Sequence, residues 1–244
     1  MKESQITSDV FQVGVSGESA PRDAAIYLIK DGNKSALIDS GSGENTETVI
    51  ENIKLCGVEL SDIAYIFVTH SHFDHTGGVN ELREVTGAKV IIHQDDAIVL
   101  ITGDEHSTGA DWYGGHIDPT PVDIIVNEKK KDFALNKLTV TMYHTPGHSP
   151  GSSVFTVNSD GKLVLFGQDV HGPAEEIQQS NQGAFLVVGG LSCGGNGMLM
   201  ISNKAEYKKS LEFLLGLDAD ILCEGHYGVY YGKEKVHEFI KSFI

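Results

Sequence analysis

Cysteine is scarce in this sequence, and long hydrophobic runs are missing from it. The 244 residues include three cysteines, Cys56, Cys193 and Cys223, which are too few and too scattered for a disulfide framework or a zinc knuckle. No apolar run approaches the roughly 18 residues that a membrane-spanning helix needs. Residues 1–9 are polar, where a secretory signal would have an apolar segment. We therefore predict a cytoplasmic protein without a membrane-spanning segment.

Basic residues are also few. The chain has 18 lysines and arginines against 34 aspartates and glutamates, which gives a formal net charge of −16. A surface this acidic repels the phosphate backbone of nucleic acids. The visible cluster of basic residues is confined to Lys129, Lys130 and Lys131. We expect a small-molecule substrate and no specific binding to RNA or DNA.

The chain contains no proline-rich or serine-rich linker and no tandem repeat. We therefore predict a single domain over residues 1–244, in which short apolar strands alternate with amphipathic helices. Strands are predicted at residues 9–15, 24–30, 35–39, 63–68, 89–93, 138–143, 152–157, 162–170 and 219–223.

The helices are predicted from their first residues and from the spacing of apolar side chains. Asn45 is expected to cap one helix, and Asn203, followed three residues later by a glutamate, another. Between them, Val79, Leu82 and Val85 recur at roughly helical spacing after two glycines. A last helix is predicted near the C-terminus.

One short stretch concentrates the polar residues that bind metals. His70, His72, Asp74 and His75 lie within six residues, directly after the apolar strand at residues 63–68. Three neutral imidazoles and a carboxylate so close together suit a divalent, borderline-soft metal ion. A polar surface turn would account for one or two of these residues, but poorly for all of them after so hydrophobic a strand. We predict a metal site here.

The pattern His-x-His-x-Asp-His after a strand resembles the signature of the metallo-β-lactamase-fold hydrolases. Further residues typical of that family follow in its order. His148 lies in the turn Thr-Pro-Gly-His, Asp169 closes a strand, and His226 follows the next one. Upstream, Asp39 follows a strand as the family's early aspartate does. Together these matches are highly specific.

The resemblance implies an α/β (α+β) fold, an αββα sandwich of two mixed sheets flanked by helices, with the site at one edge. It also implies two divalent ions, zinc by preference, with iron or manganese as alternatives. Asp169 and a water-derived hydroxide would bridge these ions. The implied ligands are His70, His72 and His148 for one ion, and Asp74, His75 and His226 for the other.

Asp74 is also counted among the catalytic residues, and two further residues are expected to assist the reaction. Asp39 is expected to orient a ligand, and Tyr227, next to the last histidine, to donate a hydrogen bond to an oxyanion. His93, at the end of a predicted strand, is interpreted as structural rather than functional.

Two stretches lack a clear periodicity. Residues 102–121 are expected to be irregular, and they are interpreted either as a lid or as a surface loop. Residues 171–202 are interpreted either as a pocket wall or as a contact between copies of the chain. If residues 102–121 and 183–201 face each other across the metals, they enclose a substrate pocket lined by Trp112, Tyr113, Phe185, Leu186 and Met198.

We therefore predict a dinuclear metal hydrolase of a small ester, thioester or lactone, similar to glyoxalase II and to lactonases. Glyoxalase II has a further helical domain after its last histidine, where this sequence has only residues 227–244, so a glutathione thioester is not the expected substrate. The alternative is an iron-dependent redox enzyme of the same fold, such as a persulfide dioxygenase. A binding module without activity is disfavoured, because it would not need the whole ligand set.

Overall fold

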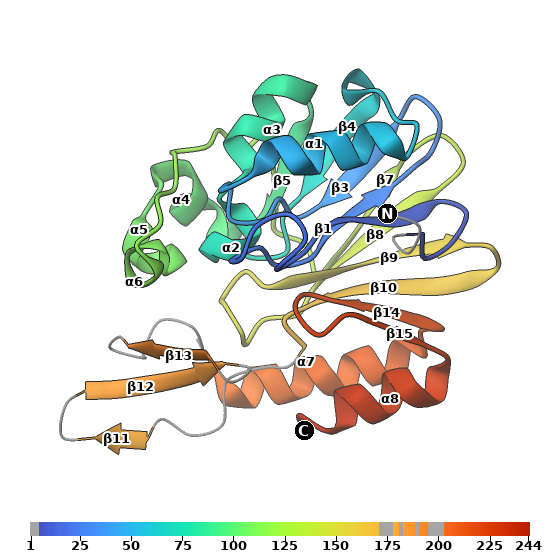
Figure 1. Cartoon of the computed structure of the whole chain (residues 1–244). Helices are drawn as coiled ribbons and strands as arrows, with labels where there is room; N and C mark the ends of the chain where they lie inside the picture. The colour runs from blue at the N-terminus through green and yellow to red at the C-terminus, as the bar shows by residue number, and fades with distance from the viewer. Residues whose placement is uncertain (1–4, 171–177, 181–182, 189–190, 195–202) are drawn as a thin grey trace.

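A computed structural model describes residues 5–170, 178–180, 183–188, 191–194 and 203–244. In it, two six-stranded sheets pack face to face, and helices cover both outer faces (Figure 1). The first sheet has the order β1 (Val10–Gly14), β2 (Ile26–Ile29), β3 (Ser35–Ile38), β4 (Ile63–Phe67), β5 (Lys89–His93), β6 (Ile124–Val126).

The second sheet comes from the C-terminal half of the chain. Its order is β15 (Val229–Tyr231), β14 (Ile221–Glu224), β10 (Lys162–Gln168), β9 (Ser153–Ser159), β8 (Thr139–His144), β7 (Lys130–Ala134). Both sheets are mixed, because β3 to β6 run parallel in the first sheet and β10 pairs parallel with β14 in the second.

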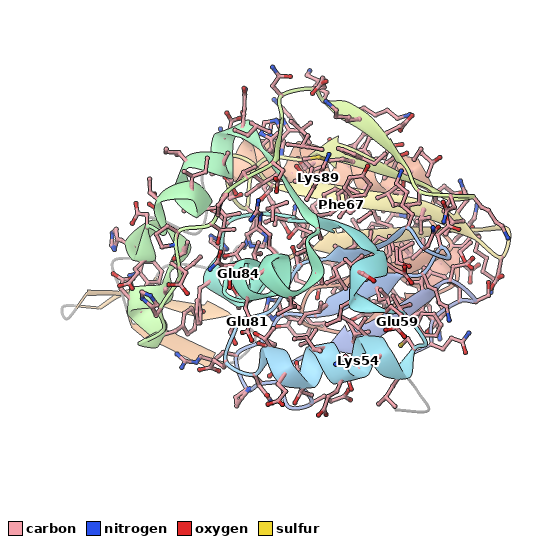
Figure 2. The ribbon with its side chains drawn as sticks, turned by 90° about the horizontal axis from the view of Figure 1, so that it is seen from above. Lys54, Glu59, Phe67, Glu81, Glu84 and Lys89 are labelled. Carbon is pink, nitrogen blue, oxygen red and sulfur yellow. The ribbon has the colours of Figure 1, made fainter. Side chains whose placement is uncertain are left out.

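The helices form the two outer layers. Helices α1 (Thr46–Leu55) and α3 (Val79–Thr86) lie on the first sheet, with the 3-10 turn η1 (Leu60–Asp62) beside them. Seen from above, α1 with Lys54 and α3 with Glu81 and Glu84 lie on the same face of this sheet, α1 against β1 and α3 against β4, the strand that carries Phe67 (Figure 2). Helices α7 (Lys204–Leu217) and α8 (Lys233–Lys241) cover the second sheet (Figure 1).

Apolar side chains fill all three spaces between these four layers. Between the sheets, the ring of Phe67 packs against those of Phe133 and Phe155, each at a centroid distance of 5.1 Å. Val49 and Leu82 pack beneath the first pair of helices, and other buried residues lie under the second pair. Burying each such side chain contributes about 1.5–3 kcal/mol. The predicted αββα sandwich of two mixed sheets is confirmed.

The predicted helix with Val79, Leu82 and Val85 is present as α3, whereas the side-chain cap predicted for α1 was wrong. Val85 is 45% exposed, because residues three apart advance by about 300°, so Val85 lies about 120° from Val79 around the helix. Asn45 occupies the position before α1, but its side chain donates a hydrogen bond to the carbonyl of Ser19 instead of capping the helix. By contrast, Asn203 accepts hydrogen bonds from two backbone amides of α7.

The stretch predicted as irregular at residues 102–121 contains short helical turns. Helix α4 (Gln94–Thr102) precedes α5 (Glu105–Thr108) and α6 (Ala110–Tyr113), and each ends at a left-handed glycine: Gly103, Gly109 and Gly114. A small antiparallel sheet is inserted in the sequence between β10 and β14 of the second large sheet: β11 (Gln178–Ser180), β12 (Gly183–Val188) and β13 (Leu191–Gly194). Helix α6 lies beside β13 (Figure 1). Among the described residues, no helix has the length and apolar character needed to cross a bilayer.

Candidate metal centre

The predicted ligands come from the ends of strands that belong to both sheets. His70 follows β4, while Asp74 and His75 lie on the single-turn helix α2 (Phe73–Thr76). Asp169 follows β10, and His226 follows β14. Gln168, at the end of β10, has a φ of 49°, in a region that residues other than glycine seldom adopt, and this turn redirects the chain at Asp169.

Four of the side chains form the first cluster, which consists of His70, His72, His148 and Asp169. The Nδ1 atom of His72 lies 2.9 Å from Nε2 of His70 and 2.9 Å from Nε2 of His148. The Oδ2 atom of Asp169 lies 3.1 Å from Nε2 of His148 and 3.9 Å from Nε2 of His70. All four side chains are buried, and their donor atoms converge on one point.

The second cluster consists of Asp74, His75 and His226, and Asp169 reaches it as well. Oδ2 of Asp74 lies 3.2 Å from Nε2 of His226 and 3.8 Å from Nε2 of His75. The other carboxylate oxygen of Asp169, Oδ1, lies 3.0 Å from Nε2 of His75 and 3.4 Å from Nε2 of His226. Asp169 therefore presents one oxygen to each cluster.

These residues fit divalent metal ions. Donor atoms about 2.0–2.2 Å from a tetrahedral ion lie about 3.3–3.6 Å from one another, within the range of separations found here. In addition, His75 Nε2 and Asp169 Oδ1 are buried and face each other without a hydrogen-bond partner. Buried polar atoms are rarely left without a partner, and an ion between these two would satisfy both. The His/Asp clusters are therefore consistent with metal binding.

Asp39 is linked by hydrogen bonds to both clusters. It lies at the end of β3 with a φ of 60°, and its Oδ2 is 2.8 Å from Nδ1 of His75. Its carboxylate also accepts hydrogen bonds from the backbone N–H and the hydroxyl of Thr69, and that hydroxyl lies 3.0 Å from Nδ1 of His70. One buried carboxylate thus contacts a histidine of the second cluster directly and a histidine of the first cluster through Thr69.

The first cluster favours neutral imidazoles. Burial lowers the pKa of His70 and, with the charge of His148, lowers the pKa of His72 to about 3. Neutral imidazole is the form of histidine that binds metals. His70 and His72 therefore need no deprotonation near neutral pH before an ion can bind.

The second cluster has more negative charge around its histidines. Burial lowers the pKa of His75 and of His226, but the carboxylates of Asp169 and Asp74 outweigh it and raise both pKa values well above the usual range. Conversely, burial would raise the pKa of Asp74, but His75 and His226 lower it to about 2. Positive charge is thus strongly stabilised at this position.

Two buried residues that sequence reasoning missed hold the strand ends in place. Glu224 accepts hydrogen bonds from the backbone N–H groups of His226 and Tyr227, which fixes the last histidine's loop. Tyr207 of α7 donates its hydroxyl to the carbonyls of Asp169 and Val170. The partners of Tyr207 lie 37 and 38 residues away along the chain, and those of Glu224 are two and three residues away in the turn after β14. All of these partners are backbone groups, which carry no sequence signal.

Tyr227, the predicted hydrogen-bond donor to an oxyanion, is an exposed residue next to His226 in the sequence. Tyr227 is 45% exposed, and its ring centroid is 6.4 Å from that of Phe239 on α8. Burial raises the pKa of its hydroxyl, as do the charges of Glu224 and Asp169, so the donor form expected of Tyr227 is maintained.

The predicted pocket residues are only partly brought together. The ring of Tyr113 stacks on the ring of Phe73 at a centroid distance of 6.3 Å. In the sequence, Phe73 lies between the proposed ligands His72 and Asp74. The half-buried Trp112 packs edge-on against His106 instead. Phe185 and Leu186 lie on β12, and Met198 lies outside the described residues.

A further group of potential ligands does not suit a metal. His93, Asp95 and His144 lie close together, but the rings of His93 and His144 stack at a centroid distance of 3.6 Å and an angle of 9°. A metal lies near the plane of each imidazole that binds it, and two parallel planes share no point. This agrees with the structural role predicted for His93.

Several curated proteins with related sequences are hydrolases by name. The chain is 32% identical over 143 residues to the probable metallo-hydrolase YqgX of Bacillus subtilis, covering 59% of this chain and 64% of that protein. It is 28% identical over 204 residues to a hydroxyacylglutathione hydrolase of Tolumonas auensis, covering 82% of this chain and 60% of that protein. The chain thus spans less than two thirds of the length of these relatives.

Solved structures and a family profile identify the fold and the family. MIM-2 metallo-β-lactamase superposes with a TM-score of 0.73 and 21% identity, covering 98% of this chain and 86% of that one. MEM-A1, a subclass B3 metallo-β-lactamase from a soil metagenome library, superposes with a TM-score of 0.72 and 23% identity, covering 98% and 90%. The profile of the metallo-β-lactamase superfamily matches residues 20–226. The chain therefore belongs to the metallo-β-lactamase superfamily.

Proposed function

We propose that the protein is a dinuclear metal-dependent hydrolase of small carboxylic esters, thioesters or lactones. One observation carries the proposal: Asp169 lies between the two clusters, with Oδ2 3.1 Å from His148 Nε2 and Oδ1 3.0 Å from His75 Nε2. The name of the Tolumonas relative, a hydroxyacylglutathione hydrolase, supports a thioester among the substrates. Zinc is the proposed metal, because imidazole and carboxylate ligands suit it.

The ligand arrangement accounts for the proposed chemistry. His70, His72 and His148 would hold one ion, Asp74, His75 and His226 the other, and Asp169 both. Two such ions, when bound, lower the pKa of a water molecule toward about 7 and polarise a carbonyl group. Asp39 keeps the His75 ring in position through its Nδ1 atom. Tyr227 is proposed to donate its hydroxyl to the developing oxyanion, since its phenol remains protonated.

A hydrolysis screen tests the proposed function. Zinc-reconstituted protein would be assayed against panels of lactones, thioesters and phosphodiesters, with chelated protein as the control. We expect turnover of a lactone, ester or thioester that chelation removes and added zinc restores. Cleavage of phosphodiesters alone, or no hydrolysis of any carboxylic derivative, would contradict the proposal.

The metal affinity of the second cluster should depend strongly on pH. Because Asp169 and Asp74 raise the pKa values of His75 and His226, these rings retain protons that a metal ion must displace. Affinity should therefore fall as the pH falls, by about tenfold per pH unit for each displaced proton. Calorimetric titrations with zinc in buffers of different ionisation enthalpy measure the released protons. Binding of the second ion without proton release would contradict this prediction.

Trp112 is proposed to contact the acyl part of the substrate. It lies on α6, whose neighbouring Tyr113 packs on Phe73 of the metal-binding loop. Replacing Trp112 with alanine should raise KM about tenfold, or change the preferred acyl length, without changing metal content. Ile98→Ala, at an exposed position on α4, is the control. Identical KM values for the Trp112 variant and the unaltered protein, at every acyl length, would exclude this contact.

We also propose that the protein does not bind nucleic acid specifically. In the cluster of three lysines, Lys131 pairs with Glu128 at 2.9 Å, and the ammonium group of Lys130 lies over the ring of Tyr143. Together with the net charge of −16, this leaves little positive potential for a phosphate backbone. Labelled oligonucleotides should show no binding by fluorescence anisotropy. Salt-sensitive micromolar binding would overturn the prediction.

A further inference from the structure

A buried carboxylate outside the metal clusters joins the two loops that carry the histidines of the first cluster. Asp96 lies in the first turn of α4 and is only 1% exposed. Its Oδ2 accepts hydrogen bonds from the backbone N–H of Ser71 at 3.0 Å and from the hydroxyl of Ser149 at 2.7 Å. Its Oδ1 accepts a hydrogen bond from the backbone N–H of Gly151 at 2.7 Å.

The partners of Asp96 are adjacent to the ligands in the chain. Ser71 lies between His70 and His72, and Ser149 directly follows His148. Asp96 therefore fixes the distance between two loops that belong to different sheets, and all three histidines of the first cluster depend on that distance. No residue of the second cluster is hydrogen-bonded to the carboxylate among the described residues.

The packing around Asp96 leaves little room for adjustment. A Cβ atom on Gly151 would lie 2.7 Å from three atoms of Asp96, so only glycine allows the loop to come so close. A buried carboxylate is stabilised by hydrogen bonds that are roughly twice as strong as those between neutral groups. In the described part of the chain, no lysine or arginine forms an ion pair with Asp96, so its charge is stabilised by these N–H and O–H donors.

We propose that Asp96 is a positioning residue for the first metal ion, one that sets the geometry of His70, His72 and His148 without touching the ion. This inference rests on the metal sites proposed above. It also separates Asp96 from Asp39, because Asp39 contacts His75 directly and His70 through Thr69, whereas Asp96 acts on the first cluster alone. Loss of such a hydrogen-bonding partner of a ligand typically weakens metal binding by about 10–100-fold.

The test measures zinc affinity at one cluster at a time. His226→Ala leaves the first cluster intact, and His148→Ala leaves the second, so competition with a chromophoric chelator reports a single dissociation constant in each background. Asp96→Asn should raise the dissociation constant about 10–100-fold in the His226→Ala background and less than about threefold in the His148→Ala background. Asp95→Asn, at the exposed neighbouring position, is the matched control and should change neither.

The outcomes are distinct. Equal weakening at both clusters would show that Asp96 stabilises the fold in general, and unchanged affinity at the first cluster would show that it does not position the ligands; either result overturns the inference. If Asp96→Asn does not fold, Ser149→Ala replaces it as the test variant, because it keeps the carboxylate and both backbone donors. Ser149→Ala should also raise the zinc dissociation constant more at the first cluster than at the second, by a smaller factor than Asp96→Asn. If the unaltered protein binds no zinc, the metal sites themselves are wrong, and this inference fails with them.

Discussion

Replacing Asp169 with alanine is expected to reduce hydrolysis at least about a thousandfold, equivalent to about 4 kcal/mol of transition-state stabilisation. The carboxylate presents Oδ2 to the first cluster and Oδ1 to the second, so its removal takes a ligand from both proposed ions at once. Among the residues that the structure describes, no other side chain presents an atom to both clusters in this way. Among the proposed ligands, Asp169 should therefore give the largest loss of activity when replaced.

Metal content and thermal stability measured on the same preparation test this expectation. Asp169 lies at the end of β10, and its Oδ1 has no hydrogen-bond partner, so the apoprotein fold should persist. Asp160→Asn, in the exposed turn at the other end of the same hairpin, is a matched control with normal activity expected. An Asp169→Ala protein that retains two ions and more than a tenth of the activity would contradict the bridging role.

Replacing His75 with alanine should leave about one ion per chain and lower activity at least about a hundredfold. His75 is fully buried, with Nε2 3.0 Å from Asp169 Oδ1 and Nδ1 2.8 Å from Asp39 Oδ2. Its removal takes a ligand from the second cluster and leaves Asp39 without one hydrogen-bond partner. A cost to folding stability of about 1–3 kcal/mol is expected from the loss of that partner.

Activity must be measured with excess metal, so that weakened affinity is separated from loss of the site. His237→Ala, a histidine on α8 that lies 3.3 Å from Asp218, serves as a control with no expected effect on metal content. Full activity of metal-replete His75→Ala would mean that the second cluster takes no part in the reaction.

The metal ligands could be predicted because four of them follow one apolar strand, and because His148, Asp169 and His226 match the order of residues in the metallo-β-lactamase family. His70, His72, Asp74 and His75 follow one apolar strand, and strands are the elements whose ends converge at one edge of a sandwich. The structure brings all of the predicted ligands together in the two clusters. Short apolar strands bounded by turns were likewise recognisable along the chain.

The residues that hold the ligands could not be predicted in the same way. Asp96 accepts hydrogen bonds from Ser71 and Ser149, which lie 25 and 53 residues away along the chain, and its neighbours in sequence give no sign of those partners. Glu224 and Thr69 bond to groups one to three residues away, but no pattern of residue types marks those bonds. Asp96 in particular lies in the first turn of α4, where a carboxylate is ordinarily explained by its favourable interaction with the helix dipole.

The substrate side was less predictable for a different reason. Helices α5 and α6 are four residues each, too short for a hydrophobic period to appear, so residues 102–121 were expected to be irregular. Their position comes from tertiary contacts such as Gly115 against the ring of Phe73, where a Cβ atom would lie 2.5 Å away. The single domain over residues 1–244 and a contact between copies of the chain stay predictions.

Metal analysis of the protein, purified without oxygen and assayed at once for hydrolysis and for oxygen consumption, tests the central claim most directly. The account predicts about two zinc ions per chain, hydrolysis that depends on them, and no oxygen consumption. A protein that holds iron and consumes oxygen, without metal-dependent hydrolysis of any ester, thioester or lactone, would contradict it.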